Sequence, residues 1–227
     1  MENVLLKISI MLVPALLAVT IHEVSHGLVA DRYGDPTARL LGRLTLNPLR
    51  YLDPIGSIAL LVFGFGWARP VPVNPTSLRR DRRSMVWVAL AGPGSNLLLA
   101  LICAFILRFV VGLTVQFAEG SQLYRFIEPV GLMAAFGLYI NVILCLFNLL
   151  PIPPLDGGRV LTNLLPERQA QLLRRIEPFG FLIIVFLIFG TSLWSQLFGP
   201  LVFAVVALLA GPQVDVVEHT MRLLFYG

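Results

Sequence analysis

Long apolar runs dominate the hydrophobic pattern of this chain and predict helices that cross a membrane. A helix needs roughly 20 consecutive apolar residues to span a bilayer. Glycine, serine and proline interrupt the last apolar block at Gly190-Thr191-Ser192 and at Gly199-Pro200, which predicts two shorter helices there. The runs are Val4–Ala30, Met85–Val111, Phe126–Leu149 and the interrupted block Pro178–Ala210.

A further apolar run, Ile55–Phe65, is ambiguous. It has only about 11 residues, too few for a straight spanning helix, so a re-entrant or oblique segment fits best unless a spanning helix starts at Leu49. The nearby stretches Ala38–Leu46 and Ala68–Val73 alternate small or polar residues with apolar ones, which predicts short strands. Strand edges at membrane depth need cover from protein or a water cavity, so we expect these strands at the membrane interface.

Composition supports a membrane protein. Hydrophobic residues make up 57% of the 227 residues, charged residues only 13%, and the mean hydropathy is +0.82. Soluble domains carry about 25% charged residues. We therefore expect an all-α polytopic membrane protein with about five to six transmembrane helices, plus the interfacial strands and the re-entrant segment. One membrane domain would cover residues 1–227, with a catalytic core at about 4–165 and two C-terminal helices at about 178–211.

Basic residues are concentrated beside the apolar runs. Nine arginines lie between Asp31 and Ser84 and four between Pro151 and Pro178, whereas the loop Thr114–Arg125 has one. The positive-inside rule places both arginine-rich segments on the cytoplasmic face if Ile55–Phe65 re-enters the membrane. This distribution explains the net charge of +4 without nucleic-acid binding. A multi-pass protein in the plasma membrane of a prokaryote, with its active site towards the cytoplasm, is the expected localisation.

The strongest chemical signal is the H-E-x-x-H pattern at the end of the first predicted helix. His22 and His26 are two of the three histidines in the chain. Residues four apart share one face of a helix, so both imidazoles can bind one Zn²⁺. Glu23 between them can act as general base on water at the metal. Ionisable groups in an apolar helix are costly to insert into a bilayer and usually mark function.

A catalytic zinc site needs a third protein ligand. Asp156 is the other carboxylate at an abrupt end of an apolar run, after three prolines and before Gly157-Gly158. The prolines end the helix and the glycines allow close approach, so Asp156 could face the metal. A plain Asp-Gly turn, or an N-cap for a short helix at Arg159–Leu165, explains the same residues equally well.

These motifs resemble those of the site-2 protease family of intramembrane metalloproteases. The resemblance extends over roughly residues 15–165 and implies zinc ligands His22, His26 and Asp156, with Glu23 as catalytic base. It also implies that Asn148 lies near the metal and steadies the substrate or the oxyanion; an amide that satisfies broken helix ends is the alternative. The matching segments are His22-Glu23-x-x-His26, Asp53-Pro54-Ile55-Gly56, Ala91-Gly92-Pro93-Gly94-Ser95-Asn96, Asn148-x-x-Pro151 and Leu155-Asp156-Gly157-Gly158.

The resemblance implies one Zn²⁺ per chain and hydrolysis of peptide bonds in or near transmembrane helices of membrane-protein substrates. The predicted strands could pair with an unwound substrate by strand addition. Two other functions remain open: a non-catalytic regulator or escort of membrane helices, and a transporter. A transporter would spread acidic groups over several helices, and an escort would have a damaged motif.

Overall fold

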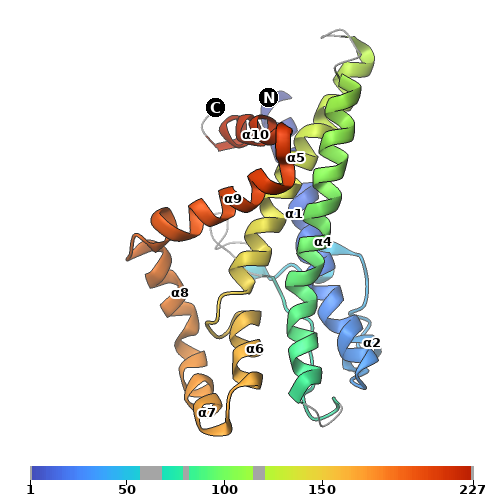
Figure 1. Ribbon diagram of the computed structural model, residues 1–227. Helices are drawn as coiled ribbons and strands as arrows, with labels where there is room; N and C mark the ends of the chain where they lie inside the picture. Colours follow the sequence, from blue (N-terminus) through green and yellow to red (C-terminus); the bar gives the residue numbers. More distant parts are fainter. Residues whose placement is uncertain (1, 57–67, 79–81, 115–120, 226–227) are drawn as a thin grey trace. The chain divides into compact units, whose positions relative to one another are not determined.

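Helices form nearly all of the regular structure in the computed structural model, which describes residues 2–56, 68–78, 82–114 and 121–225 (Figure 1). Short 3₁₀ turns and one π-helical turn, labelled η, join several of the α-helices. The long elements are α1 (Glu2–Arg32), α4 (Arg82–Thr114) and α5 (Gln122–Asn148). The shorter ones are α2 (Thr37–Leu40), η1 (Pro48–Arg50), α6 (Asp156–Leu164), α7 (Glu167–Ile176), η2 (Glu177–Phe179), α8 (Gly180–Phe189), η3 (Trp194–Phe198), α9 (Gly199–Ala210), η4 (Gly211–Gln213) and α10 (Val214–Phe225).

Four helical stretches among the described residues are long and apolar enough to cross a membrane: Leu5–Arg32, Arg82–Thr114, Gln122–Asn148 and Trp194–Phe225. The first three confirm the helices predicted from the long apolar runs. The fourth continues through η3, α9, η4 and α10. The count of five to six spans is not confirmed, because α8 has ten residues, fewer than a span requires.

The predicted strands are not found among the described residues. Residues 37–40 form α2 in place of the first predicted strand, because Asp35 accepts a hydrogen bond from the Thr37 backbone N–H at 3.1 Å and starts a helical turn. Gly42 then reverses the chain with a φ of 62°. The second predicted strand, 68–73, is extended but has only one isolated bridge, between Leu52 and Ala68. The predicted re-entrant run at 55–65 lies mostly outside the described residues.

The chain divides into two compact units, and the first comprises residues 1–18, 96–144 and 191–227. An apolar cluster centred on Ile10, Leu132 and Phe136 forms part of its core. Buried Asn96 donates hydrogen bonds to Asn141 Oδ1 at 2.9 Å and to the carbonyl of Ala18 at 3.3 Å. These bonds join three helices, so Asn96 has a packing role in this structure.

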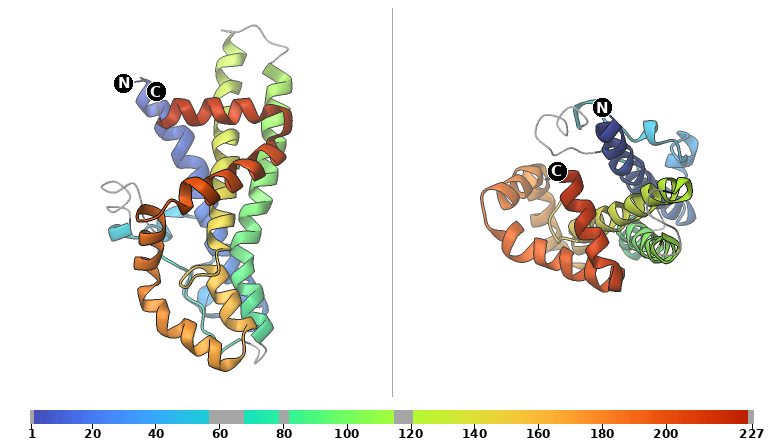
Figure 2. Two further views of the ribbon diagram at one scale, coloured as in Figure 1. Left: turned by 60° about the vertical axis from the view of Figure 1, so that its left-hand side comes forward. Right: turned by 90° about the horizontal axis from the view of Figure 1, so that it is seen from above.

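The C-terminal part of the first unit bends sharply between α9 and α10 (Figure 2). Gly211 lies at the bend with a φ of 60°, which side chains rarely adopt. Arg108 on α4 donates hydrogen bonds to the carbonyls of Leu209 at 2.7 Å and Ala210 at 3.4 Å. A cation therefore satisfies the free carbonyls at the end of α9.

The second unit comprises residues 19–95 and 145–190. Two apolar clusters hold its loops against the helices: one contains Val24, Ala38, Tyr51 and Val71, the other Ala30, Leu78 and Val88. Arg82 at the start of α4 donates to Glu167 on α7 at 2.5 Å and to the carbonyl of Leu165 at 3.0 Å. These are exposed contacts, which contribute little to stability.

Within the second unit, α7 joins α6 to α8, and the two run in opposite directions (Figure 1). Close backbone approach makes this arrangement depend on glycine. A Cβ on Gly180 would lie 1.9 Å from the carbonyl oxygen of Pro153. The start of α8 therefore has no room for any side chain.

We expect Gly180→Ala to destabilise the protein by about 2–3 kcal/mol, because the methyl group collides with backbone that cannot turn away. The thermal unfolding midpoint in detergent measures this. Gly112→Ala on α4 is the matched control, since its Cβ would meet nothing within 4 Å. Equal midpoints for the two variants would contradict the close approach.

Candidate metal centre

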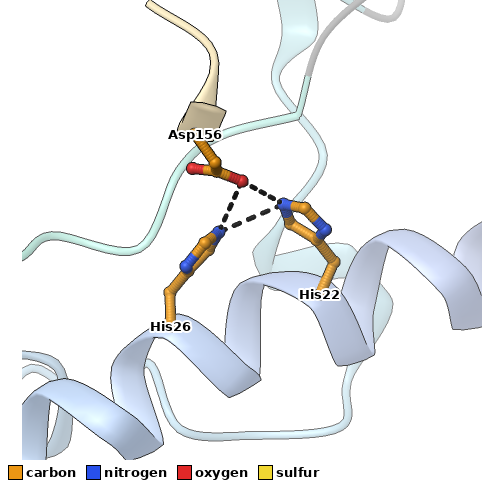
Figure 3. A group of neighbouring side chains, drawn as sticks. All are labelled: His22, His26 and Asp156. Atoms are coloured by element: carbon orange, nitrogen blue, oxygen red, sulfur yellow. Dashed lines mark hydrogen bonds and ion pairs between the residues drawn. The ribbon is translucent and has the colours of Figure 1, made fainter. Parts of the chain in front are cut away.

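Helix α1 presents His22 and His26 on one face, one turn apart. Their Nε2 atoms lie 3.1 Å from each other, and both side chains are buried (Figure 3). The rings meet edge to face at a centroid distance of 4.7 Å. The two nitrogens therefore converge on one point, as the spacing of four residues predicts.

Asp156 reaches the same point from the start of α6 (Figure 3). Its Oδ2 lies 3.2 Å from Nε2 of His22 and 3.2 Å from Nε2 of His26. Gly157 and Gly158 make this approach possible: a Cβ on Gly157 would lie 2.2 Å from the carbonyl oxygen of Leu149, and one on Gly158 would lie 2.3 Å from the backbone nitrogen of Pro153. Asp156 is thus neither in a plain turn nor an N-cap, since Leu155 occupies the cap position.

The three atoms fit a zinc ion. Ligands at 2.0–2.1 Å in a tetrahedron are separated by about 3.3 Å, close to the three separations seen here. Oδ2 of Asp156 is buried and accepts no hydrogen bond from any part of the chain that the structure describes. Two imidazole nitrogens and one carboxylate oxygen also form a common donor set of catalytic zinc sites. The arrangement therefore satisfies distance, ligand type and an otherwise unexplained polar atom.

The carbonyl of Val88 fixes the orientation of the His26 ring from the side opposite Asp156. Nδ1 of His26 lies 2.7 Å from the carbonyl oxygen of Val88 on α4. A carbonyl only accepts, so Nδ1 carries a proton, and the other ring nitrogen, Nε2, faces Asp156. An outer hydrogen bond of this kind is typical of histidines that bind metal.

Gly92 on α4 lies directly against both imidazoles. A Cβ there would be 2.4 Å from Nε2 of His26 and 2.6 Å from Nε2 of His22. Any side chain at this position would therefore press on both Nε2 atoms. Gly92 was part of a matching motif in the sequence, but no spacing rule connects it to histidines some 70 residues earlier.

The carboxyl group of Asp156 is ionised, which is the form in which a carboxylate can bind a metal. Burial alone would raise its pKa, but the facing imidazoles of His22 and His26 outweigh burial and hold the pKa well below its usual range. Arg159 adds a weak contact, with Nη1 3.8 Å from Oδ1. Asp156 therefore keeps its negative charge although it is buried.

Glu23 is half-buried beside the two histidines on α1. Its Oε2 accepts a hydrogen bond from the backbone N–H of Val71 at 2.8 Å. Val71 lies in the extended stretch that the sequence predicted as a strand. A backbone amide 48 residues away is thus a direct partner of the predicted base, and nothing in the sequence pattern identified it.

Asn148 is the last residue of α5 and is half-buried in the same unit. The segment that follows it, 149–155, leads directly to Asp156 at the start of α6. His219, the third histidine, lies on α10 in the first unit. The structure therefore brings together His22, His26 and Asp156, while the role predicted for Asn148 remains a prediction.

Comparison with known proteins gives consistent matches. Residues 10–133 and 115–191 match the family described as Peptidase family M50. One relative, named "Putative zinc metalloprotease YwhC", from Bacillus subtilis, is 41% identical over 193 residues, which cover 84% of each chain. A relative from Mycolicibacterium smegmatis, named "Putative zinc metalloprotease Rip2", is 34% identical over 78% of this chain and 66% of its own. MJ0611 of Methanocaldococcus jannaschii is 36% identical over 62% of each. No solved structure is significantly similar to the chain.

The chain belongs to peptidase family M50, the site-2 protease family that its motifs resemble. Together with the four apolar helices, this membership makes it an integral membrane protein of the metalloprotease class.

Proposed function

We propose that this chain is a zinc-dependent protease that hydrolyses peptide bonds in or beside transmembrane segments of membrane proteins. The observation that carries the proposal is the convergence of His22, His26 and Asp156 within 4.8 Å of one another, next to Glu23 on an apolar helix. Ionisable side chains are costly in an apolar helix, and apolar side chains would pack there at lower cost, so the group indicates a function.

His22 and His26, through Nε2, and Asp156, through Oδ2, would hold one Zn²⁺. When bound, the ion supplies Lewis-acid chemistry, which polarises a carbonyl and acidifies water. Val88 and Gly92 support the ligand set: the first orients the His26 ring, and the second leaves the ligand atoms uncovered. Together these two residues would keep the ligand set oriented and clear of a side chain from α4.

Glu23 would take a proton from the attacking water and return it to the leaving amine. Asn148 would donate its side-chain amide to the oxygen of the scissile carbonyl as negative charge develops there. Its place at the end of α5, just before the segment that leads to Asp156, supports this role. Removal of one oxyanion donor typically costs about 10²–10³ in kcat.

The protein would lie in the plasma membrane of a prokaryote, and its active site would open to the cytoplasm. The arginine-rich segments before α4 and around α7 support this orientation. One membrane domain over residues 1–227, a fifth or sixth span and a re-entrant segment at 55–65 belong to the same proposal. The partners would be the lipid bilayer and a substrate with a transmembrane helix.

The substrate helix must unwind near the site, because a fully hydrogen-bonded backbone cannot be cut. Strand addition on the extended stretch 68–73 is limited by its own bonding. Pro70 and Pro72 have no backbone N–H, and the N–H of Val71 is bonded to Glu23. A substrate strand would therefore depend on the remaining groups of this stretch.

Glu23→Gln tests the function most simply. We expect the wild-type protein, reconstituted in liposomes, to cleave at least one member of a panel of single-span membrane proteins. The variant should keep its zinc but cleave about 10²- to 10⁴-fold more slowly, because it lacks the general base. Product mass spectrometry and elemental analysis measure the two quantities. Equal cleavage by wild type and variant would exclude Glu23 as the base.

A further inference from the structure

The stretch Arg69–Asn74 has few backbone N–H donors, because two of its residues are prolines. Pro70 and Pro72 flank Val71 on both sides, and proline has no amide hydrogen. Val71 is therefore the one residue of 70–72 with a backbone N–H. That N–H donates to Oε2 of Glu23 at 2.8 Å.

Hydrogen bonds fix this stretch at its N-terminal end. The N–H of Arg69 donates to the carbonyl of Tyr51 at 2.7 Å. The guanidinium of Arg43 donates to the carbonyls of Arg69 at 3.0 Å and Pro70 at 3.3 Å. The chain therefore enters Val71 in one conformation.

A buried carboxylate fixes the other end. Asp35, which is fully buried, accepts the N–H of Asn74 through Oδ2 at 2.6 Å. Its Oδ1 is held in turn by the N–H of Thr37 at 3.1 Å. The turn that follows α1 and the end of the stretch are thus joined directly.

The Val71 side chain locks the register between these two ends. It is buried in the cluster with Val24, Ala38 and Tyr51. Gly27 lies against it, since a Cβ there would be 3.0 Å from Cγ1 of Val71. A shift by one residue would move Val71 out of this cluster and present a proline to Glu23.

We propose that Val71 is a positioning residue for the general base. Its backbone N–H holds Oε2 of Glu23, which leaves Oε1 as the oxygen that exchanges a proton with water and with the leaving amine. The prolines on either side ensure that no neighbouring amide competes for the carboxylate. The inference rests on the proposed function and adds to it a device that selects one oxygen and one rotamer of Glu23.

The physical benefit is preorganisation. A hydrogen bond to a carboxylate is roughly twice as strong as one between neutral groups. A free glutamate side chain samples several rotamers, and a misplacement of about 1 Å can cost 10²-fold in rate. Because Val71 is fixed before substrate binds, the orientation of Glu23 costs nothing at the moment of reaction.

A spectroscopic test reads the contact without any measurement of activity. Labelling with carbonyl-¹³C proline and ¹⁵N valine selects only Pro-Val pairs, of which the chain has three: 70–71, 72–73 and 129–130. We expect Glu23→Gln to move the amide proton of Val71 upfield, because a neutral acceptor makes a weaker bond. Val73 and Val130 serve as internal controls. A Val71 resonance that moves no more than these two would overturn the proposal.

A kinetic test uses Val71→Pro, which removes the N–H, against Val71→Ala, which keeps it. We expect kcat for Val71→Pro to fall at least about tenfold below that of Val71→Ala, with KM and zinc content unchanged, because the base is misplaced while the metal site is intact. In a Glu23→Gln background the two variants should cleave at the same residual rate. Equal kcat values for the two variants in the wild-type background would refute the inference while the proposed function stands.

Failure of the proposed function has a different signature. In that case the wild-type protein itself would bind no zinc and cleave no member of the substrate panel. If Val71→Pro does not fold, the resonance of Val71 in wild type and in Glu23→Gln still decides the inference, because both of those proteins keep the native backbone.

Discussion

Replacing Asp156 with asparagine is expected to remove zinc from the purified protein and to abolish peptide hydrolysis with it. Asparagine has the same size and keeps the start of α6, but it removes the negative charge that faces His22 and His26. A neutral amide is a poor zinc ligand, and two imidazoles alone leave the ion without its third protein ligand. Affinity should fall by more than the 10–100-fold that loss of an outer-shell partner typically costs.

Asp31→Asn is the matched control for this prediction. This substitution makes the same charge change, but the partner of Asp31 is Arg39 at 3.4 Å, outside the metal centre. Elemental mass spectrometry on both variants gives zinc per chain. If Asp156→Asn retained one zinc per chain, Asp156 could not be a ligand.

Replacing Gly92 with alanine should also weaken zinc binding, through a steric clash rather than through loss of charge. The new methyl group would lie within 2.6 Å of Nε2 of both histidines, which is closer than any real contact. Neither ring can turn away easily, because both are buried and Nδ1 of His26 is bonded to Val88. We expect zinc affinity to fall at least about tenfold, as for loss of an outer-shell partner, and cleavage to fall with it.

Gly94→Ala, two residues further along α4, provides the control. Its Cβ would meet nothing within 4 Å, so zinc content and cleavage should stay at the wild-type level. Both variants add the same methyl group to the same helix, and only one adds it beside the imidazoles. Identical zinc content in the two would contradict the position of Gly92.

The parts of the site that sequence could predict are those governed by local spacing. His22 and His26 converge because four residues make about one helical turn. The long helices followed from apolar runs of sufficient length. Asp156 was open from its own segment alone, since a turn or a cap explained it as well, and only the distance to the imidazoles distinguishes the three explanations.

The remaining parts depend on contacts between distant segments. Val88 lies 62 residues from His26, and Val71 lies 48 residues from Glu23. No periodicity relates such positions. The predicted strand at Ala38–Leu46 failed for a related reason: buried Asp35 begins a helical turn at Thr37, which overrides the alternating pattern.

Asp35 illustrates how one polar residue changes a local prediction. Burial alone would raise its pKa, but hydrogen bonds from Thr37 and Asn74 outweigh burial and hold the pKa below its usual value. The ionised carboxylate thus organises two separate stretches of chain at once. No motif around Asp35 in the sequence predicts this role.

The central claim is that His22, His26 and Asp156 hold a catalytic zinc ion, and zinc K-edge X-ray absorption on the detergent-purified protein tests it most directly. We predict a first shell of nitrogen and oxygen only, at about 2.0–2.1 Å, with outer scattering from two imidazole rings. A protein without zinc, or a shell with sulfur at about 2.3 Å, would contradict the account, because the first leaves the convergence without a purpose and the second requires a cysteine ligand.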